Sequence, residues 1–519
     1  MFVRKKKNRS GRVSVVVVSK SGGQYKEVKT IGVSSDVDEI EYLYKQGLVW
    51  IKQNSGQDDL FDKVEQVAFE QNAVDYFFDN VESVLLNGPQ QILEPVYKSI
   101  GFDKINDTIL KHLVISRICQ PSSKVATVEY LKSYFDEDVE LHNIYRYLDT
   151  LNNKRQEEIQ QVSVEHTRKL LQGKIGLLFY DVTTLYFETD AGDDLRKTGF
   201  SKDGKHSQPQ ILLGLLVSMG GYPLAYTVHE GNKYEGHTML PVIEDFVKRF
   251  SLDDFVVVAD SGLMNKENVE KLEAQGYKYI IGARIKNESK AVTSWILSLK
   301  KKNGIFHEYK KNEKSRLIIS YSEKRAKKDS YNRDKGIRRL EKEYKSGKIT
   351  KDKINKRGYN KFLEISDDVN VNINYDKIKA DEKWDGLKGY ITNTSLPAQT
   401  VYEEYRGLWQ VERAFRISKG RLELRPMFHF TRKRIEAHIC ICFVAYKVYK
   451  ELERILVLND IGMSVDKVLD IAKTIVTIRV KMSTSHKSIS KTMLLTESHR
   501  SIAILFDENF WNDNLLRIE

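Results

Sequence analysis

The spacing of apolar residues changes along the chain, and each change predicts a different kind of element. Residues 12–34 hold two β-rich runs on either side of a Ser-Gly-Gly turn, a pattern typical of a hairpin. From about 57 to 172 apolar residues recur at three and four positions, which predicts a series of helices. Short helices near 123–134 and 142–151 could form a helix-turn-helix, although a plain helical bundle fits them better.

The middle of the chain changes to strand-like patterning. The run "KIGLLFYDVTTLYFE" predicts a buried strand that ends in Asp181, and residues 209–232 predict a long hairpin turned at Gly220-Gly221. Helix-like and strand-like segments then alternate, with one strand ending in Asp260. Three strands joined by tight turns and followed by this alternation predict an α/β fold with a mixed sheet. The order matches the ribonuclease H-like sheet.

The alternation stops after Ile285 for over a hundred residues, and segment 287–390 reads as an insertion into the sheet domain. A helix is then expected over Val401–Lys419. Its apolar row comprises Leu408, Val411, Phe415 and Leu422, at core-facing spacing. Tyr405, Glu412 and Lys419 are seven residues apart, so they should share one stripe beside that row. A carboxylate at the edge of a core needs a partner.

The composition is that of a globular protein. Of 519 residues 41% are hydrophobic, and three cysteines are too few for a disulfide framework. The basic start lacks the apolar run of a secretory signal, and no stretch approaches a membrane span. We therefore expect a soluble, cytoplasmic protein without membrane contact.

The net charge of +12 is concentrated in one segment. Between Lys300 and Lys361 there are 23 Lys and Arg against 8 Asp and Glu, and Met1–Thr30 forms a smaller basic cluster. Such concentrated charge suits a polyanion, and nucleic acid is the leading candidate. A merely solvated lysine-rich face is the alternative.

Asp181 and Asp260 each follow an apolar run, where sites form in open α/β sheets. Singly, either could be a capping or turn residue. Together with Glu412 they would form a group of carboxylates whose mutual repulsion calls for cations. Oxygen ligands of this kind suit Mg²⁺ or Mn²⁺, and two such ions would serve phosphodiester hydrolysis or strand transfer.

These residues resemble a known family. The order Asp181, Asp260, Glu412 in a ribonuclease H-like sheet is similar to the DDE transposases of bacterial insertion sequences. The helix resembles the Tyr-x2-Arg-x3-Glu-x6-Lys motif of the subgroup with a large insertion before the glutamate, with "YDVTTLYFE", "VVVADSGLMN" and "YRGLWQVERAF" among the matching stretches. Leu408 stands where the motif has arginine, which leaves Arg406 or Arg413 to replace its phosphate contact.

The resemblance implies a transposase that binds the inverted ends of its element, cleaves DNA with two Mg²⁺ ions, for which Mn²⁺ can substitute, and joins 3′-hydroxyls to target DNA. It implies a homodimer in a synaptic complex with double-stranded DNA, associated with the bacterial nucleoid. The expected DNA contacts are Tyr405, Arg406, Lys419, Lys327, Lys328, Arg338 and Arg339. A displaced base could stack on Trp295 or Trp384, whereas Trp409 is expected to be buried.

The sequence divides into six expected parts. The first two are a basic β unit at 1–55 that could serve as a DNA-binding arm and a helical DNA-binding or dimerisation domain at 57–172. The catalytic domain follows in two pieces, 173–286 and 391–455, with the basic insertion at 287–390 between them, and a small α/β region occupies 456–519. Two alternatives stay open. One is a hydrolytic DNA nuclease of the same fold, and the other is a non-enzymatic DNA-binding protein derived from a transposase.

Overall fold

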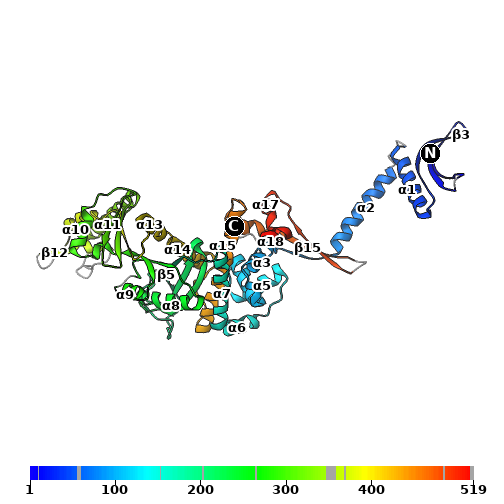
Figure 1. The fold of residues 1–519 in the computed structure, drawn as a ribbon. Coiled ribbons are helices and arrows are strands. Elements are labelled where there is room, and N and C mark those ends of the chain that lie inside the picture. The colour runs from blue at the N-terminus through cyan, green and yellow to red at the C-terminus, as the bar shows by residue number, and fades with distance from the viewer. Residues whose placement is uncertain are drawn as a thin grey trace. The chain divides into compact units, whose positions relative to one another are not determined.

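The computed structural model contains an eight-stranded mixed sheet with the order β10-β11-β14-β9-β8-β5-β6-β7. Figure 1 labels β5 of this sheet. The model describes residues 1–9, 11–54, 60–151, 153–201, 204–263, 266–346, 358–366, 370–482 and 486–514. β7, β6 and β5 are antiparallel, β5, β8 and β9 are parallel, and β14, β11 and β10 continue antiparallel from β9. This mixed sheet confirms the predicted α/β, ribonuclease H-like class.

The five strands expected from the apolar runs are all present. They are β5 (Leu177–Tyr186), β6 (Gln210–Ser218), β7 (Pro223–Glu230), β8 (Val256–Ala259) and β9 (Lys278–Ala283). Every residue of β6 is buried, which explains its continuous apolar run. The β6–β7 turn uses positive φ at Gly220 and Gly221, a conformation that glycine adopts without strain. β5 does not end at Asp181 as expected, because its pairing with β6 continues to Tyr186.

Helices cover both faces of the sheet. α8 (Met239–Phe250) and α9 (Lys266–Ala274) lie on one side of β5, and α13 (Ala398–Arg406) and α14 (Trp409–Arg416) lie on the other (Figure 1). The first side has one buried apolar cluster with Phe246 and Leu272 in it. The second side shares a larger cluster with the helical part of the chain, and Val411 belongs to it.

The inserted segment is partly continuous with the central sheet. β10 (Phe306–Lys310), β11 (Arg316–Tyr321) and β14 (Leu387–Thr392) extend the sheet beyond β9. The other elements of the segment are α10 (Lys290–Ser298), α11 (Glu323–Lys345), β12 (Leu363–Ser366), β13 (Asn370–Ile373) and α12 (Tyr375–Glu382). Leu340, Phe362 and Ile378 give α11 and α12 a small core of their own. The end of the expected basic stretch, 347–357, lies outside the described residues.

The helical segment packs around one long buried helix, α15 (Arg432–Leu458). Its helices are α3 (Gly88–Ile100), α4 (Thr108–Cys119), α5 (Lys124–Phe135), α6 (Leu141–Thr150) and α7 (Asn153–Leu170). Ser123 caps α5 by accepting a hydrogen bond from the backbone N–H of Ala126, as its position after Pro121 predicts. α16 (Val465–Ala472), α17 (Glu497–Arg500) and α18 (Glu508–Asn514) complete this part.

A separate unit comprises Met1–Val84 with Ile478–Lys491. Its β1 (Phe2–Lys7), β2 (Val13–Ser21) and β3 (Gln24–Ser34) form an antiparallel sheet, and β2 and β3 are the predicted hairpin. Two helices follow the sheet, α1 (Val37–Asn54) and α2 (Leu60–Asp79). α1 lies where only β structure was expected. β4 (Val81–Leu85), β15 (Val476–Lys481) and β16 (Ser488–Met493) form a second small sheet. Among the helices that the structure describes, none is both long and apolar enough to cross a membrane.

Candidate active site

Two aspartates stand side by side at the centre of the sheet. β5 and β8 are parallel, with Phe179 opposite Val258 and Tyr180 opposite Ala259. The same register places Asp181 beside Asp260, which directly follows β8. Phe179 and Val258, two residues earlier on each strand, face the core that α14 shares. Because side chains alternate along a strand, both aspartates lie on the face of the sheet that α13 and α14 cover.

Tyr405 ties the end of β8 to α13. Its hydroxyl donates a hydrogen bond of 3.0 Å to Oδ1 of Asp260, and its side chain is buried with 4% exposed. Burial, followed by Asp260 and more distantly Glu412, raises the pKa of Tyr405 well above its ordinary value, so the hydroxyl keeps its proton. We expected this hydroxyl to donate to a DNA phosphate, but in the structure it donates its hydrogen bond to Asp260.

Room for that hydrogen bond depends on a glycine. A Cβ at Gly282 of β9 would lie 2.5 Å from the Tyr405 hydroxyl oxygen, closer than atoms can approach. The ring of Tyr405 also packs on Tyr390 of β14, with 4.8 Å between ring centroids. Neighbouring strands therefore fix the tyrosine that holds Asp260.

Glu412 lies on α14, but the helix that carries it is not continuous with the helix of Tyr405. α13 ends at Arg406 and α14 begins at Trp409, across a tight turn in which the backbone N–H of Leu408 donates to Tyr405 O at 3.1 Å. Gly407 permits the turn to press against the sheet, since a Cβ there would lie 2.5 Å from Cζ of Phe179. The expected single helix over Val401–Lys419 is therefore wrong.

The apolar row of that region is as predicted. Leu408, Val411, Phe415 and Leu422 are all buried, and Glu412 is exposed at their border. Leu408 is a core residue, with 6% exposed, where the motif has arginine. Of the two arginines that could replace it, Arg413 donates to both carboxylate oxygens of Glu453, whereas Arg406 is exposed and stacks on Tyr402. Arg406 is therefore the better placed of the two to meet a ligand.

Lys388 of β14 is a site residue that sequence reasoning missed. Its ammonium lies 4.4 Å from the centroid of the Tyr405 ring. Burial and nearby Arg325 lower the pKa of Lys388, while Asp260 and Glu412 act in the opposite direction. Both carboxylates are therefore near enough to Lys388 to act on its charge. The signal in the sequence was a lysine interrupting the apolar strand "GLKGYIT".

Three carboxylates suit divalent cations in their donor chemistry, since oxygen ligands are those that Mg²⁺ and Mn²⁺ prefer. The chain brings Asp181 and Asp260 together by strand register, and α14, which carries Glu412, packs on the same face of the sheet. Within the described ranges, however, no three His, Cys, Asp or Glu side chains are gathered tightly enough to enclose a metal ion. The residues fit such ions by type.

The other expected DNA contacts are spread over two elements. Lys419 is half-buried in a π-helical turn, Ile417–Arg421, that follows α14. The four expected contacts on α11 are Lys327, Lys328, Arg338 and Arg339, and all four are exposed. Lys327 pairs with Glu323 at 3.1 Å and Arg339 with Glu343 at 3.2 Å. Since eleven residues make three turns, the two pairs of basic residues lie along one face of α11.

The three tryptophans differ in exposure. Trp295 and Trp384 are partly buried against the sheet core, where Trp295 packs on Tyr309 with 5.1 Å between ring centroids. Trp409, which we expected to be buried, is 53% exposed on α14. It stands beside the apolar row and not in it, one position after the buried Leu408, and Arg413 lies over its ring at 6.0 Å.

Comparison with known proteins adds two likenesses to this geometry. A family model described as "Transposase DDE domain" matches residues 172–447. The chain is also similar to a solved structure titled "Cryo-EM structure of piggyBac transposase synaptic complex with hairpin DNA (SNHP)", with 9% identity, a TM-score of 0.38, and coverage of 82% of this chain and 79% of that one. The comparison of this chain with curated protein sequences found no match.

Proposed function

The chain belongs to the transposase DDE domain family, and from this premise we propose that it binds the inverted ends of its own insertion sequence, cleaves them, and joins their 3′-hydroxyls to target DNA. The observation that supports the proposal is the register that places Asp181 beside Asp260 on the face of the sheet that α14, the helix of Glu412, covers, with the hydroxyl of Tyr405 donating to Asp260. In a matched family domain, such carboxylates are the expected catalytic group.

We propose Asp181, Asp260 and Glu412 as the residues that hold two divalent ions, Mg²⁺ or Mn²⁺. Such ions, when bound, supply Lewis acidity to the attacking and leaving oxygens of a phosphodiester. The protein's own contribution is orientation. Tyr405 fixes one oxygen of Asp260, and this leaves the other oxygen of that carboxylate for a ligand.

Lys388 contributes positive charge at the same place. Three carboxylates in a small volume repel one another, and a nearby ammonium offsets part of that repulsion. The ammonium of Lys388 lies over the rings of Tyr405 and Tyr390, at 4.4 and 5.9 Å from their centroids, and it forms no ion pair with any residue that the structure describes. It can therefore turn toward a phosphodiester oxygen without breaking a salt bridge.

DNA binding is assigned to three parts of the chain. Arg406 and Lys419 flank the catalytic helix, and the basic face of α11 contributes Lys327, Lys328, Arg338 and Arg339. We propose the helical segment 57–172 as the third part. A homodimer follows from the reaction, because two element ends must be held in one synaptic complex.

The test compares the full chain with its Asp181→Asn, Asp260→Asn and Glu412→Gln variants on a duplex carrying the inverted repeat that flanks the gene. All three variants should bind this DNA as the parent does but fail to cut it with Mg²⁺. Glu403→Gln on α13 is the matched control, since Glu403 is exposed and its hydrogen bond is to Gln399 on its own helix. Cleavage that survives in a folded Glu412→Gln variant would overturn the assignment. Products that stop at hydrolysis, without joined strands, would favour a nuclease.

A further inference from the structure

A cavity of about 550 Å³ lies in the helical part of the chain, away from the carboxylates. It is enclosed by the end of α4, the start of α5, α6, the segment that follows the π-helical turn, and the first turns of α15. Its lining includes Arg117, Lys124, His429, Arg434 and the exposed Phe428 and Phe430. We call the part formed by Arg117, Lys124 and His429 the cationic recess.

Two buried cations of the recess lack an anionic partner. Arg117 and Lys124 are each 7% exposed, and across the described residues neither side chain makes a hydrogen bond or an ion pair. Burying a cation without compensation is costly, and proteins pair such groups or bind an ion there. Arg434, by contrast, donates to both carboxylate oxygens of Asp149, each at 2.7 Å. Glu423 is the single carboxylate among the residues lining this cavity, and it is exposed.

The titrating groups of the recess respond to one another's positive charge. Burial, followed by Arg117, lowers the pKa of Lys124 to about 7. Burial, followed by Lys124, Arg117 and Arg434, lowers the pKa of His429 to about 4. Both pKa values are lowered because the neighbours of these basic groups are themselves positively charged. A negative charge in the recess would stabilise the protonated forms.

Two helix amino termini add to the same positive field. Ser122, Ser123 and Lys124 at the start of α5 line the cavity, as do Thr431 and Arg434 at the start of α15. Thr431, the N-cap of α15, makes no side-chain capping hydrogen bond. Free backbone N–H groups at a helix start favour an anion, and the combination with arginine and lysine suits a phosphate group.

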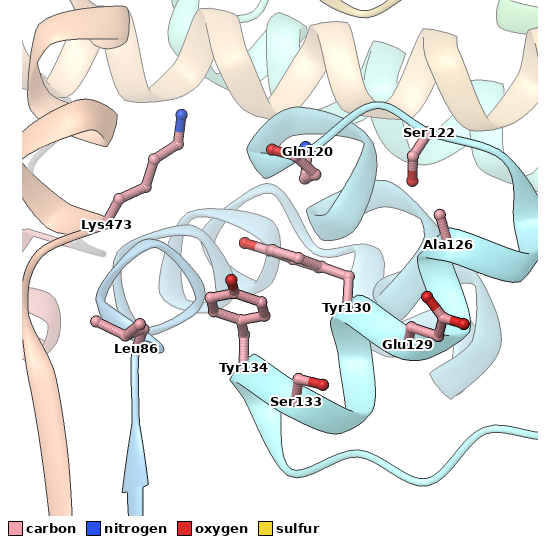
Figure 2. Close-up of a pocket in the computed structure, with 9 residues that line it drawn as sticks. All are labelled: Leu86, Gln120, Ser122, Ala126, Glu129, Tyr130, Ser133, Tyr134 and Lys473. Atoms are coloured by element: carbon pink, nitrogen blue, oxygen red, sulfur yellow. The ribbon is translucent and has the colours of Figure 1, made fainter.

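The neighbouring cavity provides a contrast within the same molecule. It has about the same volume, 570 Å³, and Figure 2 shows Lys473 across it from Tyr130 and Tyr134 of α5. Its one lysine already pairs with Asp470 at 3.1 Å, and Glu129 supplies a carboxylate. Charge there is balanced, so size alone does not set the cationic recess apart.

Basic and aromatic side chains join the recess to the end of β5, the strand of Asp181. Arg425 lies over the ring of Tyr186 at 5.7 Å, and Arg196 lies over Phe187 and Phe430 at 5.5 and 5.4 Å. Arg196 is 8% exposed and donates to Asp193 at 2.9 Å, so it holds Phe430 in place from below the surface. Exposed rings beside basic groups are typical of sites that bind single-stranded nucleic acid. Phe428, 68% exposed at the mouth of the cavity, offers an open ring face for a base.

We propose that the cationic recess binds a phosphate group of a DNA strand through Arg117, Lys124 and the amino termini of α5 and α15. That the strand is DNA rests on the proposed function, whereas the affinity for phosphate does not. Free phosphate is the other source of the same chemistry, and the experiment separates the two.

The first arm measures thermal unfolding of the full chain in inorganic phosphate against chloride at equal ionic strength. Phosphate should raise the unfolding temperature of the parent and of Lys473→Gln, but not of Arg117→Gln or Lys124→Met. Without phosphate the latter two should unfold at the parent's temperature or above it, because each removes one of two buried like charges. Two variants are used so that a folding failure of one leaves the other. The proposal is overturned if phosphate does not stabilise the parent, or if both variants are less stable than the parent without phosphate. Either result would mean that Arg117 and Lys124 serve only to stabilise the fold.

The second arm measures binding of a DNA duplex with a single-stranded extension at several salt concentrations. The slope of log affinity against log salt should shrink by about 0.7 to 0.9 in Arg117→Gln, the value for one lost phosphate contact, and stay unchanged in Lys473→Gln. An unchanged slope in Arg117→Gln, with the phosphate effect present in the parent, would assign the recess to free phosphate and overturn its role in DNA binding. Failure of the catalytic proposal would appear instead as cleavage by Glu412→Gln.

Discussion

Replacing Tyr405 by phenylalanine isolates the hydrogen bond that orients Asp260. The change deletes the 3.0 Å hydrogen bond from the tyrosine hydroxyl to Oδ1 and leaves the ring in place against Tyr390 and Lys388. A hydrogen bond to a charged acceptor contributes about 1.5–3 kcal/mol. If that energy holds the carboxylate for catalysis, its loss should slow cleavage roughly 10- to 150-fold, at about 1.4 kcal/mol for each tenfold change.

Stability should change little in the same variant. Asp260 is exposed, so water can replace the lost donor, and the unfolding temperature should move by no more than about 2 °C. Because the pKa of Tyr405 is raised well above its ordinary value, the parent hydroxyl stays protonated, and the difference in rate should persist at alkaline pH. The assay is single-turnover cleavage of element-end DNA at saturating Mg²⁺, over a range of pH.

Tyr402→Phe is the matched control for this prediction. Tyr402 lies on the same helix, is half-buried, and packs its ring on Phe306 with 5.4 Å between centroids, while its hydroxyl makes no hydrogen bond within the described part of the chain. Its removal should leave the rate within about twofold of the parent, because no stabilising interaction is lost. The reasoning is refuted if a stable Tyr405→Phe protein cuts as fast as Tyr402→Phe.

Two further changes test other contacts. Gly282→Ala places a Cβ 2.5 Å from the Tyr405 hydroxyl oxygen, so it should displace that hydroxyl and slow cleavage as Tyr405→Phe does. The double variant should then be little slower than either single variant. Additive losses of rate in single-turnover cleavage would contradict this. Although burial opposes it, His166, whose Nε2 lies 3.7 Å from Oε1 of Glu451, and Arg454, which donates to both carboxylate oxygens, lower the pKa of Glu451 to about 2 from its ordinary 4.5. A depressed carboxyl pKa stabilises the fold above the unfolded value, so Glu451→Gln should cost about 3 kcal/mol in unfolding free energy at neutral pH. In urea titrations that difference should shrink as pH falls from 4.5 toward 2, and a difference independent of pH would contradict the assignment.

The sequence could predict the sheet because its strands are marked by local patterns. Runs such as the buried β6 and the glycine turn at Gly220 carry their own signal, and two aspartates at strand positions could be placed together from the strand order alone. The apolar row through Val411 and Phe415 was equally visible. These features depend on residues close together in the chain.

The remainder depends on contacts between distant segments. The break at Gly407 follows from its approach to Phe179, and the period of apolar residues continues across it, so the pattern gives no warning. β14 joins the sheet because Gly389 pairs with Ala283 more than a hundred residues earlier. The recess of Arg117 and Lys124 was invisible for the same reason, since charged residues on separate helices normally indicate solvated faces.

The leucine at position 408 also has a physical explanation in this arrangement. Leu408 is 6% exposed beneath the turn between α13 and α14, so an arginine there would bury its guanidinium among apolar side chains unless the turn opened. Positive charge beside the carboxylates comes instead from the inserted segment, through Lys388 of β14 with Arg325 of α11 close to it. The site is thus built from both sides of the insertion, with its acids on the sheet and the α14 helix and its cations on the inserted elements. Since β14 is also a strand of the central sheet, the insertion cannot be removed without removing the lysine and the register that hold Tyr405 against Asp260.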